Sequence, residues 1–282
     1  MAIAKRLGSA PAVAEPPSLS TLRIEIDDEI GVLTLARPDA LNAMSPEMIG
    51  ELATAASWLA DRAPLRALIV TGAGRAFSAG GDVTWFRGGV EDESVDLAAS
   101  VRHGADVLHQ AIVDFRRIPY AVIAAVNGPA AGAGFSLALS CDVRIASEDA
   151  FFAVAYGRIG AAPDGGMTYF LPRVVGPANA LELLLDDPNL TAADALARGL
   201  VSEVVPVAEL MDAARGRAEA LARKAPHYVR MCKLLIAQSL DNQLAAHLQL
   251  ERHGIADSMA TDDLREGIRA FFGGEEPAFR GR

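Results

Sequence analysis

Long runs of apolar residues followed by glycine-rich loops recur along the first two-thirds of the chain. Leu65–Thr71 and Tyr120–Val126 are continuously apolar, which is typical of parallel strands that are buried on both faces. Because such strands alternate with loops and helical stretches, the pattern predicts an α/β core. The predicted strands are Leu22–Asp27, Gly31–Ala36, Leu65–Thr71, Tyr120–Val126, Asp142–Ala146, Phe151–Ala155 and Val201–Val205.

Helical patterns separate the strands and dominate the last third of the chain. Ser45 has the side chain of a good N-cap and is followed by Pro46, so a helix is predicted from there to about Leu59. Val83–Glu93 is rich in polar and aromatic residues and is predicted to be a loop. The other predicted helices are Val95–Arg117, a small-residue helix from about Gly132, Thr191–Arg198, Val207–Lys224, Pro226–Leu240, Asn242–Ser258 and Thr261–Phe272.

These elements divide the chain into three parts. With 282 residues, 51% of them hydrophobic and 22% charged, the chain is long and apolar enough for one large domain and a smaller appendage. Residues 1–20 are rich in Ala, Pro and Ser and are predicted to form a disordered tail. Residues 21–205 form the predicted α/β core. Residues 206–282 form a helical region with little sheet to cover, and we expect it to dock against a partner chain.

Charge and cysteine content exclude several classes of function. The net charge of −10 argues against charge-driven binding to nucleic acid. No apolar run is long enough for a transmembrane helix, and the N-terminus lacks the apolar segment of a secretory signal, so no membrane association is expected. Cys141 and Cys232 have no partners at metal-binding spacing. We expect two buried thiols in a reducing, cytoplasmic environment, and no metal site.

Two segments share one layout, in which a buried strand leads through small residues to the start of a helix. They are Gly72–Asp82 and Asn127–Gly134. Loops that follow parallel strands are where α/β folds place ligands, and small residues allow a ligand to approach the backbone. Free N–H groups at a helix start attract negative charge. Two such groups aimed at one point would form an oxyanion hole, although each segment taken alone is also compatible with a plain tight turn.

The sequences of three segments point to a known family. They are AFSAGGDV (Ala76–Val83), NGPAAGAGFSLALSCDVRIAS (Asn127–Ser147) and PDGGMTYFLPRVVG (Pro163–Gly176). They resemble signature segments of the crotonase superfamily, which contains the enoyl-CoA hydratases and isomerases. ARPDALNAM (Ala36–Met44) is similar to the family's first CoA-contacting segment, and the final FRGR to its C-terminal tail. The resemblance implies a spiral of ββα turns, a helical trimerisation region, and a trimer or dimer of trimers that binds an acyl-CoA thioester without another cofactor.

The resemblance also implies roles for individual residues. The two oxyanion donors of the family match the N–H groups of Gly81 and Ala133. Their side chains are irrelevant to that role, so alanine is acceptable at position 133. Residues that match CoA-contacting positions are Ala40, Leu41, Ser78, Ala79, Phe279 and Arg280, the last two of which reach a neighbouring subunit in some family members.

One departure from the family pattern concerns the hydratase carboxylates. Hydratases of this family have glutamates at the positions that match Ser136 and Tyr156. Adding water across a C=C bond calls for two acidic groups, one to activate water and one to manage the proton. Serine is no base at neutral pH, and the phenol of tyrosine is better suited to donating a hydrogen bond. We therefore expect these two residues to shape the pocket, and the usual hydratase mechanism is disfavoured.

The segment Pro163–Gly176 contains one acidic residue, Asp164. Asp164 matches the catalytic carboxylate of the isomerase branches and also the nucleophilic aspartate of the dehalogenase branch. A single carboxylate suits a proton shift between two carbons of an unsaturated acyl chain. The alternative is a helix N-cap, because Gly165, Gly166 and a helical run follow.

Other residues are assigned with less specificity. Trp85 and Phe86 lie where the family lines its acyl site, although a hydrophobic anchor for the loop fits equally well. His103 and His109 are interpreted as surface or core histidines, and Asp82 as a carboxylate that organises its loop.

The sequence thus predicts an acyl-CoA enzyme of the crotonase type, most simply an enoyl-CoA isomerase. Three alternatives within the fold stay open: a hydratase of atypical mechanism, a thioester dehalogenase or hydrolase with Asp164 as nucleophile, and a binding protein without turnover. A nicotinamide-dependent dehydrogenase is disfavoured, because Ala76 and Ser78 stand where its nucleotide loop needs glycines and no Tyr-x-x-x-Lys pair exists.

Overall fold

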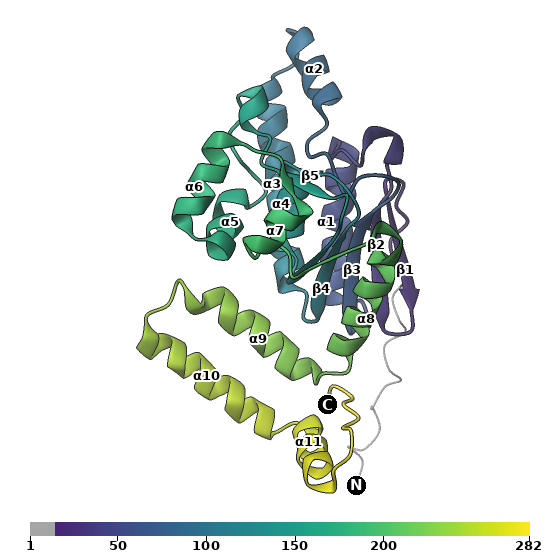
Figure 1. Cartoon of the computed structure of the whole chain (residues 1–282), viewed down its shortest axis with the longest axis vertical. Coiled ribbons are helices and arrows are strands. Elements are labelled where there is room, and N and C mark those ends of the chain that lie inside the picture. The colour runs from purple at the N-terminus through teal and green to yellow at the C-terminus, as the bar shows by residue number, and fades with distance from the viewer. Residues whose placement is uncertain (1–14) are drawn as a thin grey trace, which may run out of the picture.

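A twisted, mostly parallel sheet forms the centre of the computed structural model, which describes residues 15–282 (Figure 1). The sheet has the strand order β1-β2-β3-β4-β6-β9, in which β1 and β2 are antiparallel and all other neighbours are parallel. A smaller sheet has the order β5-β7-β8. The strands are β1 (Leu22–Asp27), β2 (Ile30–Leu35), β3 (Ala67–Gly72), β4 (Ala121–Val126), β5 (Ala130–Ala131), β6 (Val143–Ser147), β7 (Phe151–Ala153), β8 (Leu190–Thr191) and β9 (Glu203–Val205).

Both faces of the central strands are buried, as their continuous apolar runs predict. In β3, Leu68 and Val70 point into the larger hydrophobic core, which α1 and α3 cover, whereas Ala67 and Ile69 point to the opposite face. On that opposite face they pack with residues of α8, among them Ala214. Alternating side chains therefore serve two cores, and every position of the strand excludes water.

Helices surround the sheet and form the end of the chain. Ser45 caps the first helix as predicted, because its hydroxyl oxygen accepts a hydrogen bond from the N–H of Met48. The helices are α1 (Pro46–Asp61), α2 (Val83–Glu91), α3 (Leu97–Arg117), α4 (Ala133–Ser140), α5 (Met167–Val175), α6 (Pro177–Asp186), α7 (Ala192–Ala197), α8 (Leu210–Ala222), α9 (Pro226–Ser239), α10 (Leu244–Met259) and α11 (Asp262–Gly273). Short 3₁₀ helices are η1 (Pro38–Ala40), η2 (Gly157–Ile159) and η3 (Val207–Glu209).

Three expectations about this architecture were wrong or incomplete. The segment predicted to be a loop at Val83–Glu93 is largely the helix α2, because Asp82 caps its N-terminus through two backbone N–H groups. Helix α6 was not predicted, although Gly176 and Pro177 are typical of a helix start. The expectation of two buried thiols holds for Cys141 but not for Cys232, which is exposed on α9.

The C-terminal helices differ in how they meet the core. Helix α8 packs on the sheet, whereas α9, α10 and α11 extend away from the body of the molecule (Figure 1). They carry large exposed hydrophobic side chains, including Ile236, Leu244, Phe271 and Phe272. No helix in residues 15–282 is both long and apolar enough to cross a membrane. The predicted boundary at residue 205 falls between β9 and η3, and most of the predicted N-terminal tail lies outside the described residues.

Candidate active site

The loop after β3 fixes the backbone of Gly81. The N–H of Met44 donates to the carbonyl of Gly80 at 2.7 Å, and the N–H of Asp82 donates to the carbonyl of Met44 at 3.2 Å. Gly81 lies between these two bonded residues, so its peptide plane is held in place from both sides. The loop therefore presents the Gly81 N–H in a fixed direction.

The segment before α1 packs along the Gly81 loop, and this contact brings together four of the residues predicted to bind CoA: Ala40, Leu41, Ser78 and Ala79. Ala40 ends η1, and the carbonyl of Leu41 accepts a 2.9 Å hydrogen bond from the N–H of Ala79. The hydroxyl of Ser78 is fully buried and donates to the carbonyl of Asn42 at 2.8 Å. The Ser78 side chain thus holds the two segments together rather than facing solvent.

The loop after β4 lies directly against this loop. The N–H of Ala131 donates to the carbonyl of Ser78 at 2.9 Å. Ser78, in the loop after β3, and Ala130, in the segment after β4, form an isolated parallel β-bridge. Gly80 and Gly132 both have positive φ, 93° and 50°, and pack backbone against backbone. A Cβ on Gly80 would lie 2.7 Å from the carbonyl oxygen of Ala131, so only glycine fits there.

Two backbone N–H groups, those of Gly81 and Ala133, stand next to this contact. Each directly follows one of the two packed glycines, Gly80 and Gly132. Within residues 15–282 neither N–H donates a hydrogen bond to another residue. Ala133 is also the first residue of α4, where the helix dipole favours a negative partner. The two amides are therefore available to an anionic ligand atom.

A cluster of three polar side chains, Ser136, Tyr156 and Asp164, surrounds the part of α4 one turn after Ala133. Ser136 follows Ala133 by three residues, which corresponds to a rise of about 4.5 Å along the helix. Its hydroxyl lies 3.2 Å from the hydroxyl of Tyr156 and donates to the backbone carbonyl of Asp164 at 2.9 Å. The hydroxyl of Tyr156 donates to Oδ1 of Asp164 at 2.7 Å. The structure thus joins the two non-acidic positions of the family pattern to the one remaining carboxylate.

The environment of Tyr156 keeps its phenol neutral. Burial raises the pKa of Tyr156 far above its ordinary value, and the negative charge of Asp164 raises it further. At neutral pH the phenol therefore stays protonated and acts as a hydrogen-bond donor rather than as a base. Its partner oxygen, Oδ1 of Asp164, is held in place, whereas no hydrogen bond to Oδ2 is formed by any residue in the described part of the chain.

The helix-cap interpretation of Asp164 is wrong. Helix α5 begins at Met167 after Gly166, and no side chain caps it; Asp164 contributes its backbone carbonyl, which accepts from the Met167 N–H. The loop is held instead by His109, whose Nε2 accepts a 3.3 Å hydrogen bond from the N–H of Gly165. Only a surface or core role was predicted for His109, because no residue near it in the sequence indicates this contact.

Trp85 and Phe86 stand on α2, beside the Gly81 loop. The Phe86 ring is so close that a Cβ on Gly81 would lie 3.0 Å from it. Trp85 packs against Phe86 with ring centroids 5.3 Å apart. Asp82 anchors the start of this helix and accepts a 3.0 Å hydrogen bond from Arg37, in agreement with its predicted organising role. The two aromatic residues therefore form a wall next to one of the two free amides.

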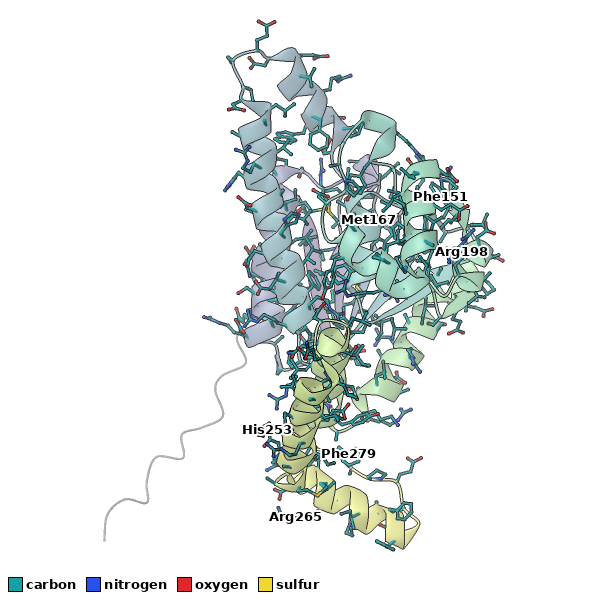
Figure 2. The ribbon with its side chains drawn as sticks, turned by 90° about the vertical axis from the view of Figure 1, so that its left-hand side faces the viewer. Phe151, Met167, Arg198, His253, Arg265 and Phe279 are labelled. Carbon is teal, nitrogen blue, oxygen red and sulfur yellow. The ribbon has the colours of Figure 1, made fainter. Side chains whose placement is uncertain are left out.

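The last two residues predicted to contact CoA lie elsewhere. The N–H of Arg280 donates to the buried carboxylate of Asp263, and the carbonyl of Phe279 lies 3.4 Å from Nη1 of Arg66, at the amino end of β3. Figure 2 shows Phe279 at the lower end of the molecule, far from Met167 in the upper body. The chain therefore does not bring its own tail to this site.

Comparisons with known proteins identify the family of the chain. The family model "Enoyl-CoA hydratase/isomerase" matches residues 25–282. A Rhodobacter capsulatus protein named "Probable enoyl-CoA hydratase" is 40% identical over 94% of this chain and 100% of its own, and the 1,2-epoxyphenylacetyl-CoA isomerase of Escherichia coli is 35% identical over 91% of this chain and 97% of its own.

Solved structures show the same fold. The enoyl-CoA hydratase from Bacillus anthracis superposes with a TM-score of 0.86 at 31% identity, over 93% of this chain and 100% of its own. The predicted crotonase fold, with its helical C-terminal region, is confirmed. This chain belongs to the enoyl-CoA hydratase/isomerase family.

Proposed function

We propose that this protein isomerises an unsaturated acyl-CoA, moving the double bond of a 3-enoyl-CoA or a related ring-derived substrate to the 2-position. Asp164 carries the proton between the two carbons. The N–H groups of Gly81 and Ala133 bind the thioester oxygen. CoA enters as part of the substrate, and the reaction needs no other cofactor.

The observation that supports this proposal is the state of the Asp164 carboxylate. Tyr156 holds Oδ1 by a 2.7 Å hydrogen bond, while Oδ2 has no partner among the described residues. Ser136 ties the same residue to α4, one turn beyond Ala133. A carboxylate with one oxygen fixed and one free is suited to accept a proton and to return it in a defined direction.

The proposed reaction has two proton transfers. Oδ2 of Asp164 removes a proton from C2, and the electrons of that C–H bond move toward the thioester. The negative charge on the thioester oxygen is stabilised by the two N–H groups, and the resulting dienolate extends from C1 to C4. Asp164 then returns the proton to C4, the double bond between C2 and C3 forms, and the carboxylate is restored.

Hydration is the principal alternative, and several relatives carry hydratase names. Two acidic groups serve that reaction in the usual mechanism. At the site described here Asp164 is accompanied by two hydroxyl groups, of which the Tyr156 phenol is held neutral. We therefore favour proton transfer over water addition.

The decisive experiment compares Asp164→Asn with the unmodified protein, using a 3-enoyl-CoA and following the conjugated thioester by its absorbance. We expect kcat to fall by about 100-fold to 10,000-fold, the range for loss of a general base. Affinity for a saturated acyl-CoA should change little. Asp149→Asn, which removes an exposed carboxylate after β6, serves as the matched control.

Three results would contradict the proposal. Near-full isomerisation by Asp164→Asn would remove Asp164 from the mechanism. Rapid addition of water to crotonyl-CoA by the unmodified protein, with slow isomerisation of 3-enoyl-CoA, would establish the hydratase. A covalent acyl-enzyme on Asp164, trapped by rapid quenching and mass spectrometry, would instead support the dehalogenase or hydrolase alternative.

We also propose that the chain assembles as a trimer or a dimer of trimers. The exposed hydrophobic side chains of α9, α10 and α11 are the surface that such an assembly would cover. The position of the C-terminal tail, at the amino end of β3, is compatible with its serving a neighbouring copy. Sedimentation equilibrium would measure the assembly directly, and a monomer at micromolar concentration would contradict it.

A further inference from the structure

Asp187, at the end of α6, contacts the chain on both sides of Tyr156. Its Oδ1 accepts a 2.8 Å hydrogen bond from the N–H of Ala155, the residue before Tyr156. Its Oδ2 accepts a 3.0 Å hydrogen bond from Nε of Arg158, two residues after Tyr156. Nη2 of Arg158 also donates to the carbonyl of Asp187 at 3.0 Å and to Oδ1 of Asn189 at 2.8 Å. We call Asp187 and Arg158 the Tyr156 clamp.

The clamp holds a backbone conformation that alanine rarely adopts. Ala155 has a φ of 62°, and Asp187 itself has a φ of 43°, both in the left-handed region. The left-handed Ala155 lies between β7, which ends at Ala153, and η2, and it turns the chain so that Tyr156 contacts Ser136 of α4. An unfavourable conformation of this kind persists only where the surroundings enforce it, and it is concentrated at functional sites.

The clamp is separate from the cluster that it supports. The Asp187 side chain is 11% exposed and the Arg158 side chain 46% exposed, and neither is bonded to Ser136 or Asp164. Tyr156 lies between Ala155 and Arg158, the two residues that Asp187 contacts, and its hydroxyl reaches both Ser136 and Asp164. A hydrogen bond of 2.7 Å between Tyr156 and Asp164 is sensitive to small displacements of the ring, because its strength falls steeply with distance and angle.

We propose that Asp187 and Arg158 are positioning residues that orient Tyr156, so that its hydroxyl fixes one oxygen of the Asp164 carboxylate and leaves the other free for the substrate. This inference rests on the proposed role of Asp164 as the proton carrier. The clamp acts through Tyr156 and touches no substrate atom. Its loss should therefore reduce kcat and leave KM nearly unchanged.

The first test compares two substitutions of Asp187. Glycine accepts the left-handed conformation without strain but lacks the carboxylate, whereas asparagine tolerates that conformation and keeps an Oδ1 acceptor for the Ala155 N–H. We expect Asp187→Gly to lower kcat by about tenfold or more, since a displacement of about 1 Å can cost about 100-fold. KM should stay within about twofold. Asp187→Asn should recover most of the lost kcat.

A second test shows whether the effect passes through Tyr156. In a Tyr156→Phe background the hydroxyl that the clamp positions is absent, so Asp187→Gly should have no further effect on kcat. A merely structural role of Asp187 would lower kcat by the same factor in both backgrounds, and this additivity would overturn the inference. If Asp187→Gly does not fold, Arg158→Gln, a change at an exposed side chain, replaces it in the same cycle.

A third readout is independent of turnover. The protein has four tyrosines, so its tyrosines can be labelled with ¹³C at the ζ-carbon and the Tyr156 resonance assigned from its loss in Tyr156→Phe. We expect this resonance to move in Asp187→Gly and to stay in place in Asp187→Asn. An unchanged resonance and unmodified kcat in Asp187→Gly, with an inactive Asp164→Asn, would reject the clamp alone. A moved resonance with a fully active Asp164→Asn would reject the proposed function and leave the clamp as a positioning device for Tyr156.

Discussion

Gly134 lies directly against Ser78, so that a Cβ atom on Gly134 would be 2.5 Å from the Cβ of Ser78 and 2.6 Å from its carbonyl oxygen. Gly134 is the second residue of α4, and Ser78 belongs to the loop that carries Gly81. The contact therefore joins the two backbone segments that offer the free N–H groups. Their relative position depends on the absence of one methyl group.

Adding that methyl group should separate the two segments. We expect Gly134→Ala to destabilise the protein by about 1–3 kcal/mol, because the methyl group meets backbone atoms that cannot move aside. Isomerase activity should fall even at temperatures where the variant is folded. Gly50→Ala is the matched control, since Gly50 lies in α1 with open space around it, and this change should raise stability by about 0.5–1 kcal/mol. If Gly134→Ala had the same stability and activity as the unmodified protein, the start of α4 and the loop of Ser78 would not be in tight contact.

The oxyanion role of Ala133 can be tested by removing its N–H. Ala133 is the first residue of α4, a position that proline tolerates because its N–H has no partner within the helix. We expect Ala133→Pro to lower kcat by about 100-fold to 1,000-fold, the effect of losing one oxyanion donor. Ala133→Gly retains the N–H and should keep most of the activity. Equal losses in the two variants, measured with the same 3-enoyl-CoA, would mean that the side chain matters and the amide does not.

The regular elements were predictable because their signals are local. Strand β1 has the predicted bounds, and the capping of α1 by Ser45 follows from two adjacent residues. Helix α2 was missed although its cap, Asp82, was recognised as a residue that organises its loop. Two glycines and several residues of low helix propensity weaken the sequence signal of this helix. The helix forms because its N-cap and its packing on α3 outweigh that low propensity.

The polar contacts of the site were predictable only in part. The likeness to family segments identified Ser136, Tyr156 and Asp164 as occupants of one pocket, yet nothing in the sequence indicates that Tyr156 bonds to Asp164. Asp187 gives no signal at all, because its partners Ala155 and Arg158 lie 32 and 29 residues away. Contacts of this kind depend on the tertiary fold, and a single sequence carries no record of them.

The aromatic wall beside Gly81 should depend on the cap of α2. We expect Asp82→Ala to destabilise α2 by about 1 kcal/mol, because both capped N–H groups and the Arg37 contact lose their acceptor. Since Trp85 and Phe86 lie on this helix, KM for the acyl-CoA should rise more than kcat falls. Asp82→Asn keeps a side-chain oxygen for the cap and should retain a near-normal KM. A rise in KM of equal size in both variants would assign the effect to the lost charge instead of the helix.

The Tyr156 hydroxyl should contribute to the rate without setting the pH dependence on the alkaline side. Tyr156→Phe removes one hydrogen bond to a carboxylate, and we expect kcat to fall by about tenfold. Burial and the neighbouring carboxylate raise the pKa of Tyr156, so the phenol stays protonated as pH rises toward 10. If the unmodified protein loses activity at alkaline pH, Tyr156→Phe should therefore lose activity over the same pH range. A loss of activity at alkaline pH that is present in the unmodified protein and absent from Tyr156→Phe would mean that the phenol ionises during catalysis.

Glu51 should make stability depend on pH in the acid range. Its carboxylate accepts hydrogen bonds from the N–H and hydroxyl groups of both Ser20 and Thr21, which fastens the start of β1 to α1. Burial by itself raises the pKa of Glu51, but the hydrogen bonds from Thr21 and Ser20 outweigh it and lower the pKa from 4.5 to about 2. The folded state thus prefers the charged form. The contribution of Glu51 is complete above pH 4.5 and is lost as pH falls from 4.5 toward 2.

Replacing Glu51 by glutamine removes this pH dependence. At pH 7 we expect Glu51→Gln to reduce the free energy of unfolding by about 1 kcal/mol, a modest value because the site is partly exposed to water. Urea denaturation at a series of pH values should show the difference between the two proteins shrinking below pH 4.5. Glu148→Gln, at an exposed position with no side-chain partner in the described chain, should show no such convergence. The difference in the free energy of unfolding between Glu51→Gln and the unmodified protein could instead keep its size down to pH 3. That result would mean that the negative charge of Glu51 is not what fastens β1 to α1.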